Sequence, residues 1–503
     1  MRRSFGIALA ASVAMASATL PAATARAFCG FYVSGADQKL YNNATMVVMM
    51  RNGTRTVLSM QNNYQGPPEG FAMVVPVPVV LAQSDVRTLP RALFQRVDVM
   101  AAPRLVEYWE QDPCPVQEEI YDNKEGGTGT RAKGEEGSMG NPKLNDHGVK
   151  IEAQFDVDEY EILILSAKDS GGLDTWLRER GYKIPAGAAE VLRPYVASGS
   201  KFFVAKVDPE KVRFDGDEAA LSPLRFHYDT ETFTLPIRLG LLNAGPAQDL
   251  IVHILGTSKR YEAANYANVF IPTNLDVADA VRNRYGEFYA ALFDRTLASK
   301  PKSIVTEYAW DATSCDPCPG PTLNSDDLNL LGGDVIKTSG FVLTRLHARY
   351  SKESLGEDLI FREASAVVGG REDFTPGAKQ SIVAAPSSQN FFQARYVIRH
   401  AWTGPVWCSS PQFGMWGGPP RGRGGPQIKP AQDLAFAPRT GLDLASMLRV
   451  DVPEMGIAAG APGVGGPRTV KTSRLTLGFL GGAGFGIVLA LATISMLRGR
   501  RDD

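Results

Sequence analysis

The stretch TMVVMMRNGTRTVLSM, residues 45–60, has the pattern of a β-hairpin. Two apolar runs flank Asn52-Gly53, a dipeptide favoured in type I′ turns because both residues tolerate a positive φ. The next apolar run, residues 70–78, predicts a strand that ends at prolines, which cannot donate to a ladder. The same patterns predict helices at 89–99, 173–180 and 188–196, and strands at 104–109, 149–165 and 201–207. We therefore expect an α+β fold rich in antiparallel sheet.

Short motifs of the first half of the chain recur in the second half in the same order. Ala92–Arg96, ALFQR, returns as Ala291–Arg295, ALFDR, and the tetrapeptide DPCP occurs at 112–115 and at 316–319. Their spacing far exceeds the repeat length of a solenoid and instead predicts two related modules, 28–225 and 226–408. Under this internal duplication, residues 41–114 should superpose on residues 235–318. The alternative is that common α+β patterns recur without duplication.

Both ends of the chain have features of an exported and anchored protein. Residues 1–27 combine a basic start, an apolar run and small residues before a cleavage site, which is typical of a signal peptide. Residues 475–497 contain no charged side chain and would form a helix roughly 35 Å long, enough to cross a bilayer. The arginines of the tail, residues 498–503, favour a cytoplasmic C-terminus. The sequence therefore predicts a single-pass protein of the bacterial inner membrane with a periplasmic ectodomain.

Two segments interrupt or follow the predicted modules. Residues 117–148 have almost no large apolar side chain and are predicted to be a disordered insertion, whereas the Gly/Pro-rich residues 409–474 are predicted to be a stalk. In the predicted membrane helix, Gly478, Gly482 and Gly486 share one face and would let two such helices pack as a homodimer. Two alternatives remain open: glycine is common in membrane helices, and the glycines could belong to a cleaved C-terminal sorting signal.

The five cysteines predict two disulfides in an exported chain. We expect a local Cys315–Cys318 bridge and a long-range Cys29–Cys408 bridge, with Cys114 free and buried. The C-x-x-C pair at 315–318 could also be a redox dithiol or half of a zinc site. However, Pro319-Gly320-Pro321 opposes the helix start that lowers a redox cysteine's pKa, and no second pair completes a zinc site.

Composition and motifs exclude several functional classes. The chain has 54 acidic and 53 basic residues, which argues against a nucleic-acid partner. No serine-hydrolase, zinc-protease or phosphate-loop motif occurs, and we predict no cofactor and no metal. The strand histidines are expected to be packed or hydrogen-bonded rather than ligands: His227, His253, His347 and His400. Six tryptophans could form a glycan-stacking surface, although most are expected in the core.

An ordered set of short motifs resembles a known family: Cys29–Phe31, Phe71–Pro78, Trp176–Tyr182, Tyr195–Gly199, Leu224–Phe226 and Leu343–Arg349. Together they are similar to domain-of-unknown-function family 2330, a group of exported bacterial envelope proteins, over residues 28–408. This resemblance implies the location and a shared fold. It implies no substrate, cofactor or catalytic residue.

We predict a binding or structural module of the cell envelope that engages a protein or cell-wall partner and is anchored in the membrane. The alternative is an enzyme, either a hydrolase of envelope polymers or a thiol oxidoreductase that uses Cys315 and Cys318. A deep cleft with converging carboxylates would favour the hydrolase. An exposed Cys315 beside a helix N-terminus would favour the oxidoreductase. An ectodomain with all its cysteines paired or buried would favour binding.

Overall fold

The computed structural model describes residues 31–33, 42–61, 72–114 and 147–464, with gaps in the last range at 183, 213, 216–217, 220, 243, 352–353, 374–379, 421–424, 431–436 and 438. The predicted signal peptide, Cys29, nearly all of the 117–148 insertion and the predicted membrane helix with its three glycines lie outside these residues. Within the described ranges, no helix has the length and apolar character needed to cross a bilayer.

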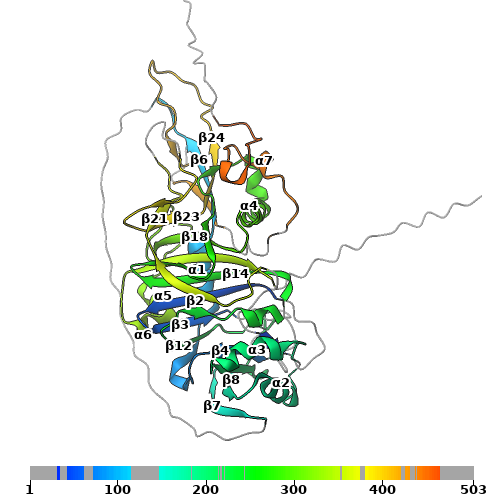
Figure 1. Ribbon diagram of the computed structural model, residues 1–503. Helices are drawn as coiled ribbons and strands as arrows, with labels where there is room; N and C mark the ends of the chain where they lie inside the picture. The colour runs from blue at the N-terminus through cyan, green and yellow to red at the C-terminus, as the bar shows by residue number, and fades with distance from the viewer. Residues whose placement is uncertain are drawn as a thin grey trace, which may run out of the picture.

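The fold is α+β and rich in antiparallel sheet, built around one large central sheet (Figure 1). At its centre, β2 (Asn42–Asn52) pairs in parallel with β14 (Ala244–Thr257), with Thr45 opposite Leu250 in the register, so the two halves of the sequence share one sheet. Across the sheet the strands are β22 (Ala385–Pro386), β21 (Val367–Gly369), β23 (Phe391–Gln393), β18 (Ser303–Asp311), β19 (Phe341–Tyr350), β14 (Ala244–Thr257), β2 (Asn42–Asn52), β3 (Arg55–Met60), β12 (Leu224–Asp229) and β5 (Val86–Thr88), with β16 (Ala267–Phe270) beside β18.

The predicted hairpin is present, but its turn is shifted by one residue. β2 and β3 are antiparallel, and Asn52 lies opposite Arg55, so Gly53 and Thr54 form the turn. Gly53 has a φ of 55°, the conformation that glycine adopts without the steric cost of a Cβ. Glycine at the first of two central positions is the arrangement of a type II′ turn rather than of the type I′ turn predicted on Asn52-Gly53.

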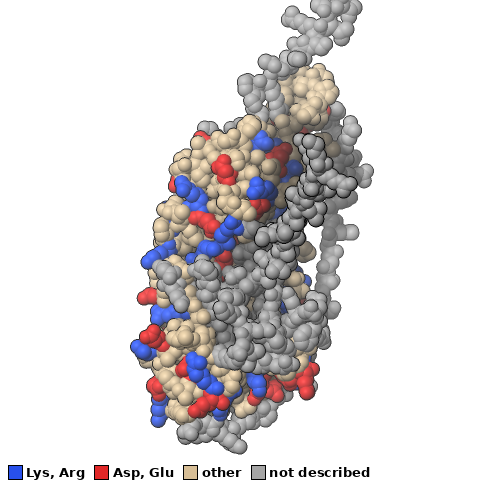
Figure 2. Space-filling model, turned by 90° about the vertical axis from the view of Figure 1, so that its right-hand side faces the viewer, with Lys and Arg blue, Asp and Glu red and all other residues tan. Residues whose placement is uncertain are grey.

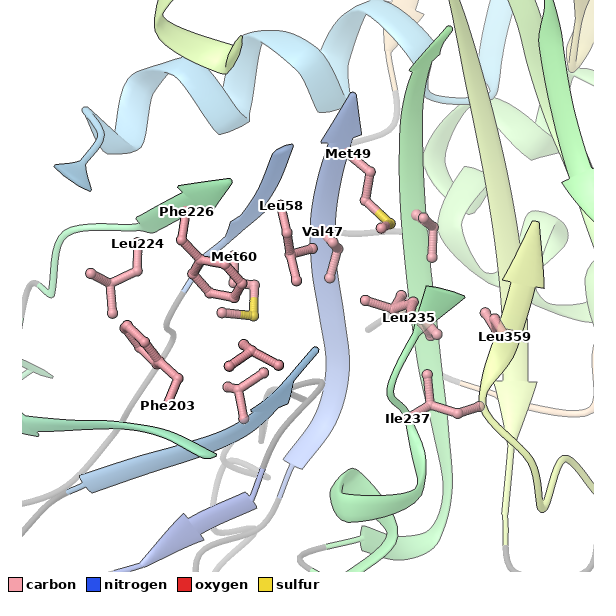
Figure 3. Close-up of a cluster of buried hydrophobic side chains, with 14 of the residues drawn as sticks. Val47, Met49, Leu58, Met60, Phe203, Leu224, Phe226, Leu235, Ile237 and Leu359 are labelled. Atoms are coloured by element: carbon pink, nitrogen blue, oxygen red, sulfur yellow. The ribbon is translucent and has the colours of Figure 1, made fainter. Parts of the chain in front are cut away.

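A second sheet packs on one face of the central sheet. It contains β1 (Phe31–Val33), β4 (Ala72–Val77), β9 (Lys201–Val207), β8 (Tyr160–Ala167) and β7 (Val149–Val157). Apolar side chains of both sheets meet in the core drawn in Figure 3, where Met60 of β3 and Phe226 of β12 lie close to Phe203 of β9. Two helices, α2 (Ser170–Glu179) and α3 (Ala188–Ala197), bury Trp176 and Leu192 against the outer face of this second sheet.

The opposite face of the central sheet carries α1 (Arg91–Ala101) and α4 (Tyr285–Ser299). A third sheet lies above them in Figure 1 and contains β17 (Leu275–Asp276), β24 (Arg395–His400), β6 (Arg104–Glu110), β25 (Trp416–Gly417) and β26 (Gln427–Pro430). The remaining strands are β13 (Thr234–Leu235), β20 (Leu359–Ala364) and β15 (Arg260–Ala263) in one small sheet, and β10 (Phe214–Asp215) with β11 (Glu218–Ala219). The short helices are η1 (Gln83–Asp85), η2 (Arg238–Leu242), η3 (Asp279–Asn283), α5 (Ser325–Leu328), η4 (Asn329–Gly333), α6 (Asp334–Ile336), α7 (Leu444–Met447) and η6 (Pro453–Met455).

Two of the predicted segment boundaries can be set beside the described elements. β12 runs through the predicted module boundary at 225/226 and pairs with both β3 and β5. Part of the predicted 409–474 stalk packs on the body, because Leu444, Leu448 and Val452 supply a row of apolar side chains to the core beneath α4. The prediction of a stalk rested on the high glycine and proline content of residues 409–474, which does not register a few regularly spaced apolar side chains.

The predicted duplication can be compared with the observed elements. Both halves run from a long strand through short strands to a helix and a returning strand, β2 to β6 and β14 to β18. Phe94 of α1 and Phe293 of α4 are both fully buried, as expected. However, corresponding strands have different partners: β4 pairs with β1 and β9, whereas β16 pairs with β18. The strand pairing therefore does not show that the two halves arose by duplication.

Candidate functional site

A buried ionic cluster lies between the central sheet and helices α1 and α4. We use this name for Asp98, Asp249, Glu307, Arg345 and His347. Arg345 donates from Nε to Glu307 Oε2 at 2.6 Å and pairs with Asp98 of α1. His347 lies between two carboxylates, with Nδ1 2.6 Å from Glu307 Oε1 and Nε2 3.1 Å from Asp249 Oδ1. Its ring stacks on Phe293 of α4 at 3.9 Å.

The strand register explains why these charges meet. In the β14–β19 pair, His253 lies opposite Arg345 and Asp249 lies opposite Arg349, and Arg345, His347 and Arg349 point to one face because side chains alternate along a strand. Asp249 also binds Arg349 at 3.0 Å and Arg439 at 3.3 Å. The cluster is thus anchored by three neighbouring strands, β14, β19 and β18, and capped by helices.

Protonation in the cluster follows from burial and from these pairings. Burial opposes the charge of Glu307, but His347 and Arg345 outweigh it and lower the pKa of this carboxyl to about 2. Burial also opposes the charge of His347, yet Glu307 and Asp249 raise its pKa above the ordinary value. Both ring nitrogens face carboxylates, which requires the doubly protonated imidazolium. The neighbouring His253 shows the opposite shift, because burial and then Arg345 lower its pKa well below the ordinary value.

The charge on His347 predicts a pH-dependent contribution to stability. Because its folded pKa is raised, the stabilisation is complete below the unfolded pKa of about 6.5 and is lost as pH rises through the folded value. We expect the difference in unfolding free energy between wild type and His347→Gln to be largest near pH 6 and to shrink above it. Urea denaturation from pH 5.5 to 9 measures this difference, and the contribution of His253 cancels because both proteins contain it.

His227→Gln is the matched control for this measurement. Burial lowers the pKa of His227, so its contribution is present above the unfolded pKa and is lost as pH falls. The two variants should therefore give opposite slopes. Equal slopes would contradict the assignment of a charged His347.

The buried ionic cluster is shielded from solvent, whereas a second polar site, the Arg238 groove, is accessible. The Arg238 groove is a cavity of about 440 Å³ between the end of β4, the C-terminal end of α3, the segment from β12 to η2, and the start of β20. It is lined by Pro76, Val77, Pro78, Tyr195, Ser198, Ser200, Tyr228, Thr232, Thr234, Pro236, Arg238, Asn265, Glu357, Asp358 and Ile360. These elements lie in the lower half of Figure 1. The lining combines hydroxyl groups, prolines, tyrosine rings, one cation, Arg238, and two carboxylates, Glu357 and Asp358.

Asp358 organises the floor of the groove. Its Oδ1 atom accepts hydrogen bonds from Tyr195 OH at 2.7 Å and from the backbone N–H groups of Ile237 at 2.9 Å and Arg238 at 3.2 Å. Burial and then Asp358 raise the pKa of Tyr195, so this hydroxyl stays a neutral donor. Asn265 fixes the neighbouring strand by donating to Asp358 O at 2.8 Å and accepting from Ile360 N–H at 3.0 Å.

Arg238 is the only basic residue of the groove lining. Its Nε atom is buried and has no hydrogen-bond partner among the described residues, and it lies 4.0 Å from Asp358 Oδ1, with which it forms a loose ion pair. A guanidinium presents a planar fork of donors that matches a carboxylate or phosphate. The groove can therefore bind a polar ligand that carries an anionic group.

The cysteines pair differently from the sequence prediction at one site. Cys315 and Cys318 are joined, with Cα atoms 4.9 Å apart, as expected. Cys408 is bonded to Cys114, with Cα atoms 5.6 Å apart, so the predicted Cys29–Cys408 pair and a free Cys114 are wrong. The physical reason is that β6 and β24 are parallel neighbours, which brings the chain after each strand to the same corner.

The neighbourhood of the C-x-x-C pair does not match that of a redox centre. Cys318 is exposed and Cys315 is partly buried, but the next helix begins only at Ser325, so no helix N-terminus lies at Cys315. Polar contacts hold the loop: Arg104 donates to Pro317 O at 2.7 Å, and Arg371 pairs with Asp316 at 2.8 Å. In the described part of the chain, no group of three His, Cys, Asp or Glu side chains is arranged to hold a metal.

The other histidines and the tryptophans are placed as follows. His400 pairs with Glu107 at 2.8 Å and stacks on Trp109, and His227 faces Asp85 at 3.5 Å. Trp176 and Trp310 are buried in the cores, whereas Trp407 is 65% exposed. The tryptophans therefore do not form one stacking surface along the groove.

Sequence reasoning missed the main polar residues of both sites. Glu307 and Arg345 occupy strand runs that are otherwise largely apolar, and such a charge within a buried strand is the signal that could have marked the cluster. Arg238 and Asp358 carry no comparable local signal, because they meet only through the fold.

Comparison with protein families places these sites in context. Residues 22–362, more than half of the chain, match the family model described as "Uncharacterized protein conserved in bacteria (DUF2330)". The chain belongs to this family. The matched DUF2330 region contains all five residues of the buried ionic cluster, and it contains the whole Arg238 groove. Comparison with curated proteins and with solved structures gave no match.

Proposed function

We propose that this DUF2330 protein is a single-pass protein of the bacterial inner membrane whose periplasmic ectodomain binds a carboxylate-bearing component of the cell envelope in the Arg238 groove. The signal-peptide pattern of residues 1–27 and the uncharged run 475–497 support export and anchoring. Gly478, Gly482 and Gly486 would allow the anchor to form a homodimer. The partner is a cell-wall polymer or an envelope protein.

The observation that carries this proposal is the exposure and the loose pairing of the Arg238 guanidinium. The Arg238 side chain is 28% exposed, is paired only loosely with Asp358 at 4.0 Å, and lies among hydroxyl groups that can orient a ligand, so its guanidinium is placed for the recognition of an anionic group. Peptide stems of peptidoglycan supply free carboxylates beside sugar hydroxyls, and this chemistry matches the lining. We therefore favour the cell wall as the source of the ligand.

The groove supports binding better than hydrolysis. A glycosidase places two carboxyl groups about 5–10 Å apart on either side of the scissile bond. The acidic side chains of the groove lining are Glu357 and Asp358, adjacent in sequence, and one Asp358 oxygen already accepts three hydrogen bonds. The thiol oxidoreductase alternative gains no support from a Cys315 that lacks a helix N-terminus.

Sedimentation with purified peptidoglycan sacculi tests the proposal. We expect the detergent-solubilised full chain to cosediment, and Arg238→Ala to weaken binding roughly 10- to 100-fold, the usual worth of a hydrogen bond to a charged group. The matched control is Arg193→Ala, which removes the same charge from an exposed position of α3 outside the groove lining. A wild-type chain that stays in the supernatant, or an Arg238→Ala variant that binds like wild type, would refute cell-wall binding through this groove.

We also propose that the two halves arose by internal duplication. Between the recurring motifs, Glu107-Tyr108-Trp109 returns as Glu307-Tyr308-Ala309-Trp310, so Glu107 and Glu307 are equivalent in the sequence repeat. Each binds one arginine and one histidine: Glu107 binds Arg282 and His400, and Glu307 binds Arg345 and His347. Each histidine also stacks on an aromatic ring. These recurring contacts support duplication, despite the different strand partners.

A further inference from the structure

An uncharged aromatic segment forms one end of the described molecule. Residues 401–420 follow β24 and contain no Asp, Glu, Lys or Arg, and we call them the aromatic tip. Trp407 is 65% exposed, and it is the only aromatic residue among the large exposed apolar side chains of the described chain. Trp402, Met415 and Trp416 are partly exposed beside it in sequence. In Figure 2, acidic and basic side chains are interspersed over the body, while the uppermost described atoms are tan.

The aromatic tip is held in this exposed arrangement by specific contacts. The carboxylate of Glu110, only 3% exposed, accepts hydrogen bonds from the N–H groups of Trp402 at 2.9 Å and Gly414 at 2.8 Å. Gln111 N–H donates to Met415 O at 2.8 Å, and the Cys114–Cys408 disulfide ties the position next to Trp407 to the end of β6. A buried carboxylate and a covalent bond thus fix a loop that leaves a tryptophan in solvent. In that position the apolar area of the ring contributes no hydrophobic free energy to folding.

The aromatic tip lies in the same half of the molecule as the end of the described chain. In Figure 1, the loops after β24 are at the top, and α7 lies beside α4 in the upper half. The last described residues are fixed there, because Gly460 N–H donates to Ala445 O at 2.8 Å and Ala461 N–H to Leu448 O at 3.0 Å. Only residues 465–474 separate this point from the predicted membrane helix, and ten residues span at most about 35 Å.

We infer that the aromatic tip lies in the headgroup region of the bilayer that holds residues 475–497, an inference that rests on the proposed membrane anchor. Tryptophan is enriched at membrane interfaces because its ring is amphipathic, with an apolar body and one N–H donor. An uncharged tip avoids the cost of bringing charged side chains to the hydrocarbon boundary. This contact orients the ectodomain so that the Arg238 groove, in the opposite half, points away from the membrane.

Fluorescence quenching in lipid vesicles tests the inference on the full chain. The predicted membrane helix contains no tryptophan, so quenching by phosphatidylcholine brominated near the headgroup reports on the ectodomain alone. We expect brominated vesicles to quench the wild-type protein, and Trp407→Phe to reduce that quenching by roughly half, since Trp402 and Trp416 also belong to the aromatic tip. The matched control, Trp176→Phe, alters a buried ring beneath α2 and should leave the quenching unchanged.

Flotation of the same vesicles separates the two proposals. Protein that floats with the vesicles but shows no quenching, or equal quenching in Trp407→Phe and wild type, overturns the contact of the aromatic tip and leaves the anchor intact. Protein that does not float overturns the anchor, and the inference with it.

Discussion

Glu307→Gln is expected to lower the free energy of unfolding by about 3–5 kcal/mol, the usual cost of removing one partner from a buried ion pair. Glu307 is fully buried and binds Arg345 and His347, each at 2.6 Å, and it accepts a further hydrogen bond from Tyr289 OH. A neutral amide cannot neutralise either cation. Both would remain buried with only Asp98 and Asp249 to balance them.

Urea denaturation at pH 7 measures this effect, because the pKa of about 2 leaves Glu307 ionised there. Glu210→Gln is the control, since Glu210 is exposed and its substitution should change stability by no more than about 0.5 kcal/mol. If Glu307→Gln cost no more than Glu210→Gln, the cluster would not stabilise the fold as described.

The second large effect is expected from the Cys114–Cys408 disulfide. The two cysteines are 294 residues apart, and in the chain-entropy model a cross-link over so long a loop stabilises a protein by about 5 kcal/mol. Replacing both cysteines with alanine should remove this contribution, while the hydrogen bonds of Glu110 still hold the aromatic tip to β6. Thermal and chemical unfolding of the double variant measure the loss.

The other disulfide is the internal control for this prediction. Cys315 and Cys318 are only three residues apart, so the same model gives their cross-link about 2 kcal/mol. The prediction is that loss of the Cys114–Cys408 disulfide lowers the free energy of unfolding more than loss of the Cys315–Cys318 disulfide. A Cys315→Ala/Cys318→Ala variant that loses as much stability as the Cys114→Ala/Cys408→Ala variant would contradict the loop-length argument.

Local patterns were sufficient to predict much of the secondary structure. The strand predicted at 201–207 matches β9, and the alternation in residues 45–60 predicted β2 and β3, because strand and hairpin signals depend on neighbouring residues. The turn was misplaced by one residue because Asn-Gly and Gly-Thr overlap in sequence. The parallel pairing of β2 with β14 had no local signal at all, since it joins segments that are distant in sequence.

The candidate sites could be predicted only in part. A strand histidine packed among partners was expected, and His347 fits that expectation. The Arg238 groove depends on five separate segments that meet only in the folded chain, so no motif could reveal it. The Cys408 prediction failed for the same reason, because it assumed that the ends of the folded chain meet, while the β6–β24 register brings Cys114 to Cys408 instead.

The parallel β2–β14 pair also determines the order in which the protein can fold. The hairpin β2–β3 can form early because its strands are adjacent, but the free edge of β2 stays open until β14 has been synthesised. Pairings between distant segments form slowly, because the chain loses loop-closure entropy before the stabilising contacts between the strands can form. An open apolar edge is a template for pairing with other chains in that interval. We therefore expect fragments that end before β14 to aggregate, and efficient production to require a holdase that covers β2 until its partner arrives.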